Sequence, residues 1–176
     1  PYTLQDPNAQ AELDSYTPGT EEYKQKQTEL WYAQWRNKAV SDPYEPGSVF
    51  KIVTASAALD NHKVSVNDHF YCNGVIDVSG TKIHCWKREG HGEQDFVKGM
   101  QNSCNPVFIT IGQRMGARTL YDYMENFGLH DKTGIDLPGE ADSIYLPYET
   151  LSKEGMVELS STSFGQSTKL TPIQLI

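Results

Sequence analysis

From residue 45 to residue 59 the chain reads EPGSVFKIVTASAAL, a proline and a glycine followed by an apolar run. An apolar run of this length after a Pro-Gly start predicts a buried helix. A helix brings positions i and i+3 onto one face, so Ser48 Oγ and Lys51 Nζ are expected to lie within reach of each other. Ser48 is therefore a candidate nucleophile, with Lys51 as its base.

The position of this pair at a helix start favours the same chemistry. The free N–H groups there place positive potential beside an alkoxide forming on Ser48. That potential and burial both lower the pKa of Lys51, which leaves a neutral amine able to accept the serine proton. On this stretch alone the alternative is an ordinary helix start, with Ser48 as a capping hydroxyl and Lys51 in solvent.

A second polar motif supports the catalytic interpretation. Residues 101–109 read QNSCNPVFI, where Ser103 and Asn105 form a Ser-x-Asn pattern before a helix predicted to begin at Pro106. Taken singly, either residue could be a helix cap. Combined with Ser48 and Lys51, the two residues complete the first two of three motifs, Ser-x-x-Lys, Ser-x-Asn and Lys-Thr-Gly, which occur together in one group of serine acyltransferases.

The chain thereby resembles the penicillin-binding protein family. Surrounding phrases resemble a class B transpeptidase domain of the division and sporulation type in Gram-positive bacteria: WRNKAV at 35–40, YEPGSVFK at 44–51, FGL at 127–129, TGIDLPGE at 133–140, FGQ at 164–166 and LTPIQ at 170–174. The resemblance extends from about Trp35 to Ile176, and residues 1–34 match more loosely. It implies an α/β (α+β) fold, the serine penicillin-recognising transpeptidase fold, mostly its helical part with the sheet incomplete.

The third motif departs from the family pattern. In the family, the active-site Lys-Thr-Gly lies on an inner strand well after the Thr-Pro-x-Gln segment, and here that segment ends the chain. A literal Lys132-Thr133-Gly134 is present, but it follows Ser103 too closely and its phrase is typical of a turn and loop. We therefore expect residues 1–176 to be a partial transpeptidase domain that lacks the strand carrying the active-site triplet.

The resemblance implies a serine-type D-Ala-D-Ala transpeptidase that cross-links peptidoglycan. Ser48 would attack the penultimate D-alanyl carbonyl of a stem peptide, and an amine from a neighbouring stem would then take the acyl group. Lys51 would deprotonate Ser48, Ser103 would relay a proton to the leaving amine, and Asn105 would donate to the substrate and position Lys51. Beta-lactams would acylate Ser48, which makes the protein an antibiotic target with a part in cell shape and resistance.

Two other functions stay open at this stage. A serine beta-lactamase or a beta-lactam sensor domain shares Ser-x-x-Lys and the acyl-enzyme, although a lactamase needs a group that activates water. The second is a non-catalytic zinc-binding or interaction module, because the third motif and several strands of the family's sheet are absent. The rate at which penicillin-labelled protein deacylates separates the first alternative from a transpeptidase, and the absence of any label on Ser48 would favour the second.

The three cysteines form a second group of candidate site residues, separate from the catalytic candidates. Their odd number excludes a fully paired disulfide framework within the chain. A hairpin predicted across Ser79-Gly80 sets Gly74 opposite Cys85 and leaves Cys72 diagonal to Cys85 on the same face. Diagonal partners lie about 7 to 8 Å apart at Cα, which is slightly long for a disulfide but suits two thiolates that share one ion.

Cys72, Cys85, His91 and Cys104 would together form a tetrahedral Cys3His zinc site. His91 lies between two glycines that let the backbone turn its ring towards the thiolates, and some class B penicillin-binding proteins resemble this in having a metal near the Ser-x-Asn loop. Such a zinc would be structural, since four protein ligands leave no position for water. His84 is a reserve ligand, although strand alternation points it away from Cys85. A Cys72–Cys85 disulfide and three buried free thiols are the open alternatives.

Composition limits the partners and the location. A net charge of -8 with scattered lysines and arginines argues against nucleic acid as a partner. The apolar stretches fall short of the ~20 residues that a membrane-spanning helix requires, so any membrane anchor is expected outside this chain. The resemblance implies stem peptides, beta-lactams and other cell-wall synthesis proteins as partners, at the extracytoplasmic face of the bacterial cell membrane.

Outside the motifs, the pattern predicts an irregular opening segment over residues 1–19 and a helix from Thr20, its cap, to about Val40. The remaining predicted elements are a helix from Ser48 to near Asn61, a hairpin over residues 70–85, short helices over Asp95 to Asn102, Pro106 to Gly116 and Ala117 to Asn126, and, from Thr150 to Gln174, a serine-rich loop followed by the start of one more helix.

Overall fold

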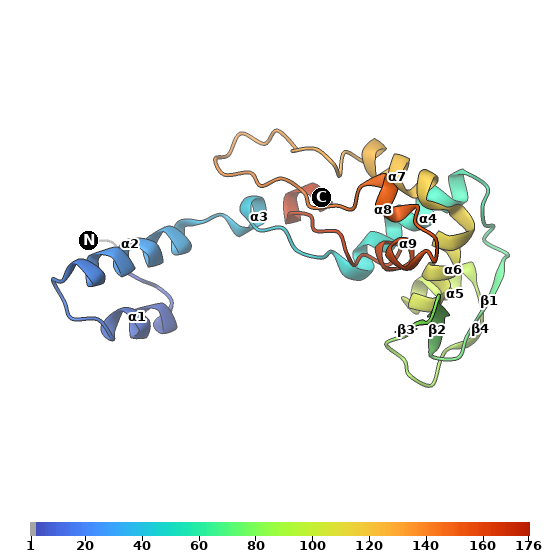
Figure 1. Ribbon diagram of the computed structural model, residues 1–176, viewed down its shortest axis with the longest axis horizontal. Helices are drawn as coiled ribbons and strands as arrows, with labels where there is room; N and C mark the ends of the chain where they lie inside the picture. The colour runs from blue at the N-terminus through green and yellow to red at the C-terminus, as the bar shows by residue number, and fades with distance from the viewer. Residues whose placement is uncertain (1–2) are drawn as a thin grey trace.

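The computed structural model describes residues 3–176, and helices dominate it (Figure 1). Residues 1 and 2 of the predicted opening segment lie outside the described part. The described elements are, in chain order, α1 Pro7–Asp14, α2 Glu21–Trp35, α3 Lys38–Ser41, η1 Gly47–Phe50, α4 Lys51–Asp60, β1 His69–Cys72, β2 Val75–Val78, β3 Thr81–His84, β4 Gly92–Asp95, α5 Phe96–Gln101, α6 Asn105–Met115, α7 Ala117–Asn126, α8 Tyr148–Leu151, α9 Val157–Thr162 and η2 Pro172–Leu175.

Helix α6 forms the centre of the core. Its side chains Val107, Phe108, Ile109 and Ile111 are at most 1% exposed. Helices α4 and α9 pack against α6, and α7 packs against both α4 and α6. Gly112 allows the approach of α9, because a Cβ at this position would lie 1.8 Å from Ser163 Oγ. The helices that begin at Lys51 and at Asn105 therefore lie at the centre of the core, and α7 and α9 add further buried side chains to it.

Two small antiparallel sheets lie beside this core. Strands β2 and β3 form the predicted hairpin, in which Val78 pairs with Thr81. Ser79 and Gly80 both have positive φ, as a two-residue hairpin turn of type I′ requires. The hairpin predicted over residues 70–85 is shorter than expected, because strand β1 pairs with β4 instead of β3, which brings Cys72 opposite Gly92. The mixed α/β character and the incomplete sheet agree with the predicted fold class.

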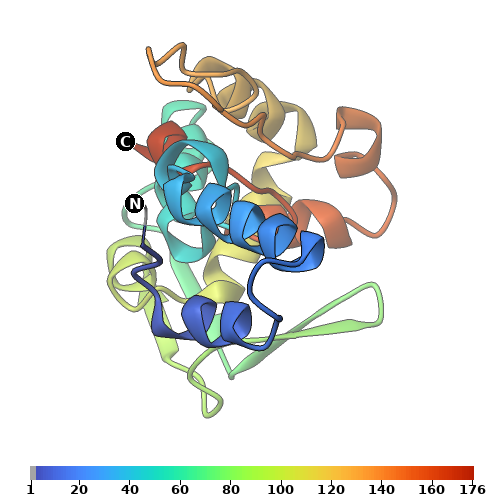
Figure 2. The same cartoon turned by 90° about the vertical axis from the view of Figure 1, so that its left-hand side faces the viewer.

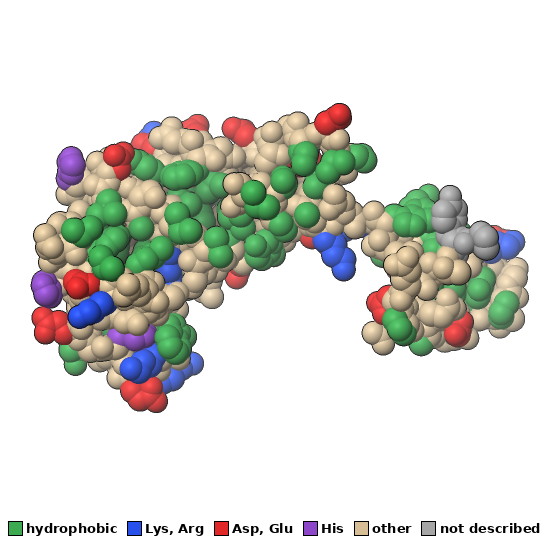
Figure 3. Space-filling model, turned by 180° about the vertical axis from the view of Figure 1, so that it is seen from behind, with side chains coloured by type: hydrophobic (Ala, Val, Ile, Leu, Met, Phe, Trp, Pro, Cys, Tyr) green, Lys and Arg blue, Asp and Glu red, His purple; other side chains and the backbone are tan. Residues whose placement is uncertain are grey.

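The amino-terminal segment differs from its prediction. Residues 7–14 form helix α1 instead of an irregular segment, because Asp6 caps it by accepting the N–H of Asn8 and Pro7 suits a first turn. Helix α2 has the predicted Thr20 cap but ends at Trp35, where Arg36 turns to extended backbone. Helices α1 and α2 pack against each other (Figure 2). They lie apart from the rest of the molecule, and a narrow segment joins them to it (Figures 1 and 3).

The predicted serine-rich loop after Thr150 was wrong over residues 157–162, which form helix α9. Ser160 is fully buried in this helix and accepts a hydrogen bond from Gln113 Nε2 on α6. Packing against α6 thus overrides the weak helix propensity of serine. Within residues 3–176, no helix is both long enough and apolar enough to cross a membrane.

Candidate active site

The candidate nucleophile and base lie on consecutive turns of one segment. Ser48 is exposed in η1, and Lys51 begins α4. A 3₁₀ turn superimposes positions i and i+3, so it brings these side chains together more directly than the predicted α-helix would. Lys51 Nζ lies 3.1 Å from Ser48 Oγ.

A distant segment holds this turn in place. The Gly47 N–H donates to the carbonyl of Gly165 at 2.9 Å, and Tyr44 and Leu170 exchange two backbone hydrogen bonds. Gly165 has φ +87°, and a Cβ on it would lie 1.9 Å from Gly47 O. The FGQ phrase, one of those that carry the family resemblance, therefore contacts Gly47, the residue before Ser48, through Gly165.

The Ser-x-Asn motif meets the same lysine. Lys51 Nζ lies 2.8 Å from Ser103 O, 2.9 Å from Ser103 Oγ and 2.7 Å from Asn105 Oδ1. Ser103 Oγ donates to Ser48 Oγ at 2.9 Å. The four catalytic candidates predicted from the sequence thus form one hydrogen-bonded group, open to solvent at Ser48.

The lysine at the centre of this group is buried. Lys51 is 1% exposed, and its burial lowers the pKa of the amine from 10.5 to about 8. The carbonyl oxygens of Ser103 and Asn105 only accept, so they take the two N–H bonds of a neutral amine. The lone pair then faces the hydroxyls of Ser48 and Ser103. Burial thus lowers the pKa of Lys51 in the predicted direction, towards the range that suits a general base near neutral pH.

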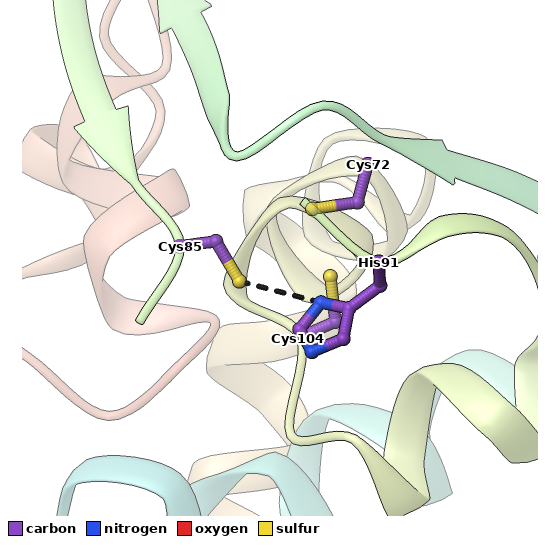
Figure 4. Close-up of side chains that lie close together, drawn as sticks. All are labelled: Cys72, Cys85, His91 and Cys104. Carbon is purple, nitrogen blue, oxygen red and sulfur yellow. Dashed lines mark hydrogen bonds between the residues drawn. The ribbon is translucent and has the colours of Figure 1, made fainter. Parts of the chain in front are cut away.

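The three cysteines and His91 also meet, next to the Ser-x-Asn turn (Figure 4). Their ligand atoms all lie within 4.8 Å of one another, and Cys85 Sγ lies 3.6 Å from His91 Nδ1. Gly90 presses against the backbone of Cys72, since a Cβ on Gly90 would lie 2.3 Å from Cys72 O. The reserve ligand His84 is exposed and lies outside this cluster.

The pKa shifts of Cys72, His91 and Cys104 differ in direction. Burial raises the pKa of Cys104 to about 12, and burial lowers the pKa of His91. Burial is the largest influence on the pKa of Cys72 and acts to raise it, but hydrogen bonds from the N–H groups of His91 and Gly74 and from the Cys104 and Cys85 side chains together bring that pKa below the usual thiol value. His91 Nε2 is buried without a hydrogen-bond partner. Neutral imidazole beside closely spaced thiols is a donor set that suits zinc.

Sequence reasoning missed two residues that hold the Ser-x-Asn turn. Trp86 Nε1 donates to the carbonyl of Asn102 at 2.9 Å, and Asn102 Nδ2 donates to Gln94 Oε1 at 2.8 Å. Trp86 directly follows Cys85, but no spacing rule connects it with Asn102. The literal Lys132-Thr133-Gly134, in contrast, lies in the loop between α7 and α8.

The fold and these motifs define a family. The family described as the penicillin binding protein transpeptidase domain matches residues 3–176. The chain therefore belongs to the penicillin-binding protein transpeptidase family, and its relatives identify it as a class B member.

Curated relatives share most of this chain. Stage V sporulation protein D of Bacillus subtilis is 47% identical over 142 residues, which are 80% of this chain and 22% of that protein. Peptidoglycan D,D-transpeptidase MrdA of Acinetobacter baumannii is 33% identical over 147 residues, which are 79% of this chain and 22% of that protein. The chain thus spans about a fifth of the length of these relatives.

Solved structures agree with the fold. A peptidoglycan glycosyltransferase from Burkholderia ambifaria has a TM-score of 0.74 at 28% identity, covering 82% of this chain and 44% of that one. Penicillin binding protein 3 from Mycobacterium tuberculosis, complexed with aztreonam, has a TM-score of 0.70 at 32% identity, covering 79% of this chain and 30% of that one.

Proposed function

We propose that this chain carries the nucleophile, base and proton relay of a peptidoglycan D,D-transpeptidase that works through an acyl-enzyme on Ser48. The observation that carries the proposal is the set of contacts from buried Lys51 Nζ to Ser48 Oγ, Ser103 Oγ and Asn105 Oδ1. Relatives named peptidoglycan D,D-transpeptidases, and a relative solved with aztreonam, support the same class of reaction.

Each residue has a distinct task in the proposed reaction. Ser48 Oγ bonds to the penultimate D-alanyl carbonyl carbon of the stem peptide while its proton moves to the neutral amine of Lys51. The C–N bond to the terminal D-alanine then breaks, and Ser103 passes a proton from Lys51 to the leaving nitrogen. An acceptor amine from a second stem peptide attacks the ester, loses a proton through the same relay and releases Ser48.

The oxyanion of this reaction requires donors that this chain supplies only in part. We propose the Ser48 N–H as one donor and a strand N–H after the active-site Lys-Thr-Gly as the other. The Lys132-Thr133-Gly134 sequence does not supply this donor, because the N–H groups of Thr133 and Gly134 donate to the Glu140 carboxylate at 2.6 and 3.2 Å. Residues 1–176 accordingly form part of the transpeptidase domain in this proposal.

Labelling with a fluorescent penicillin tests the acyl-enzyme. We expect the full-length protein to take up one label per molecule, Ser48→Ala to take up none, and Ser56→Ala on α4 to label like the wild type. No label on folded wild-type protein would sink the proposal. Slow loss of the label is expected of a transpeptidase or a sensor, whereas rapid hydrolysis would favour a beta-lactamase, and release of D-alanine from a stem peptide separates a transpeptidase from a sensor.

We also propose a structural zinc ion bound by Cys72, Cys85, His91 and Cys104. The mutual distances of up to 4.8 Å and the buried, unpartnered His91 Nε2 support this donor set. The ion would fix the hairpin segments against the turn that carries Ser103. No step of the acyl transfer passes through it.

Metal analysis of freshly purified, unchelated protein tests this site. About one zinc per chain is expected in the wild type, strongly reduced zinc in Cys72→Ser and His91→Ala, and unchanged zinc in the control His84→Ala. Cys72→Ser should also slow penicillin acylation without abolishing it, because Ser48 remains. Absence of zinc together with two protected thiols would favour the Cys72–Cys85 disulfide.

The remaining proposals concern the cellular setting. As a member of this family, the chain is proposed to act at the extracytoplasmic face of the cell membrane, on stem peptides and with other cell-wall synthesis proteins. A membrane anchor is proposed outside this chain.

A further inference from the structure

The peptide group between Asn102 and Ser103 is bonded at both ends. Its carbonyl accepts the indole N–H of Trp86 at 2.9 Å, and its N–H donates to the carbonyl of Met100 at 2.9 Å. Asn102 is tied further through its side chain, whose Nδ2 donates to Gln94 Oε1 at 2.8 Å. The orientation of this peptide is therefore fixed from three directions.

This peptide needs such support because Ser103 has φ +47°. L-residues other than Asn and Asp rarely adopt this left-handed conformation, and it persists where surrounding contacts enforce it. The same conformation directs both the carbonyl and the Oγ of Ser103 to Lys51 Nζ, at 2.8 and 2.9 Å. A rotation of the Asn102–Ser103 peptide would break both contacts.

Core packing does not account for the two side chains that hold this peptide. Trp86 is 66% exposed, so its ring contributes little buried surface, and its edge contact with His91 has a centroid distance of 5.3 Å. Gln94 is 2% exposed, and a polar side chain buried to this degree costs free energy unless it makes hydrogen bonds. For Trp86 the polar contact to Asn102 is the distinctive feature. The Gln94 side chain accepts from Asn102 through Oε1 and also acts to lower the pKa of the Cys104 thiol.

We propose that Trp86 and Gln94 are positioning residues for acyl transfer, which hold the Asn102–Ser103 peptide so that Ser103 Oγ meets Ser48 and Lys51. The inference deepens the proposed function and rests on it. The two residues act through Ser103 and do not exchange protons themselves. Their loss would slow the acylation step more than it would weaken the initial binding of a beta-lactam.

The test compares Trp86→Phe with Trp35→Phe in the full-length protein. Both variants remove an indole N–H, but Trp35 lies at the end of α2, away from this turn (Figure 1). We expect Trp86→Phe to lower the acylation rate constant for a fluorescent penicillin about fivefold to tenfold, with little change in the dissociation constant of the initial complex. Gln94→Met should act in the same direction, and Trp35→Phe should label like the wild type.

Two further readouts separate positioning from a general loss of stability. Trp86→Phe should move the midpoint of the acylation pH profile upwards, because Lys51 becomes hydrated when Ser103 withdraws and its pKa returns towards 10.5. Amide hydrogen exchange should rise in the peptide covering residues 101–105 of Trp86→Phe and stay unchanged there in Trp35→Phe.

The outcomes distinguish this inference from the proposed function. An unchanged rate constant and pH midpoint in Trp86→Phe overturn the positioning role, even where melting temperature falls. If the wild-type protein takes up no label, the transpeptidase proposal fails, and so does any role of Trp86 in acylation. Faster amide hydrogen exchange at residues 101–105 in Trp86→Phe would then support only the structural part of the inference, that Trp86 holds Asn102 in place.

Discussion

At the scale of single residues, Lys51 shows what spacing predicts and what it leaves out. The contact of Lys51 with Ser48 could be predicted because the two residues are three positions apart in a helical segment. The contacts with Ser103 and Asn105 depend on how α4 and α6 pack, and the resemblance to a family supplied that information where the physical pattern did not. Trp86 was missed because its partner Asn102 is defined only by the folded turn.

The lowered pKa of Lys51 predicts a pH dependence. Below a pKa of about 8 the amine is protonated and has no lone pair for the serine proton, so the acylation rate should rise with pH and level off above about 8. Time courses of penicillin labelling of the full-length protein between pH 6 and 10 measure this profile. Lys51→Arg, which stays protonated, should remain inactive throughout. A midpoint near 10.5 would contradict the role of burial.

At the scale of elements, sequence patterns predicted helices better than their ends. Helices α6 and α7 lie within a residue or two of prediction, because an apolar stripe and Gly116 and Gly128 mark them. Helix α1 was missed since it is short and polar. Helix α9 was taken for a loop because serine has a weak helix propensity, which the contact of buried Ser160 with α6 overrides. The β2–β3 register was predictable because a two-residue turn fixes it.

The close contact between Gly165 and Gly47, the residue before Ser48, predicts that adding a methyl group at residue 165 destabilises the protein. Gly165→Ala should destabilise the protein by more than the ~1–2 kcal/mol of a left-handed alanine, because its Cβ would lie 1.9 Å from Gly47 O. Gly128→Ala is the matched control, with φ +71° and nothing within 4 Å of the added atom. Thermal unfolding should show the larger loss for Gly165→Ala, with slower Ser48 labelling. Equal losses in the two variants would refute this.

At the scale of the whole molecule, an apolar surface lies beside the nucleophile. Val49 and Ile52 are 53% and 55% exposed on the turns that carry Ser48 and Lys51. Large apolar side chains exposed beside a candidate nucleophile indicate a contact surface. This chain covers 44% of the Burkholderia ambifaria chain, and under the proposed function we expect a part of the protein outside residues 1–176 to cover this surface.

A comparison of two lengths of the protein tests this expectation. Residues 1–176 alone should bind a dye for exposed apolar surface. They should also label with penicillin far more slowly than the full-length protein, because the second oxyanion donor is proposed to lie outside residues 1–176. Fluorescence titration and labelling time courses measure both effects. Equal labelling rates for the two lengths would show that this chain already contains a complete active site.

The turn over residues 103–105 has a consequence for sequence variation. Ser103 and Asn105 face Lys51, while Cys104 between them faces the other two thiols. Successive side chains of this short turn thus belong in alternation to two neighbouring sites. A substitution at any of the three positions would remove a contact of one site or the other. A change at residue 103 or 105 that evades an inhibitor would alter the proposed proton relay, and a change at residue 104 would alter the cysteine cluster. Heritable adaptation of this site is therefore expected to arise around the turn, not within it.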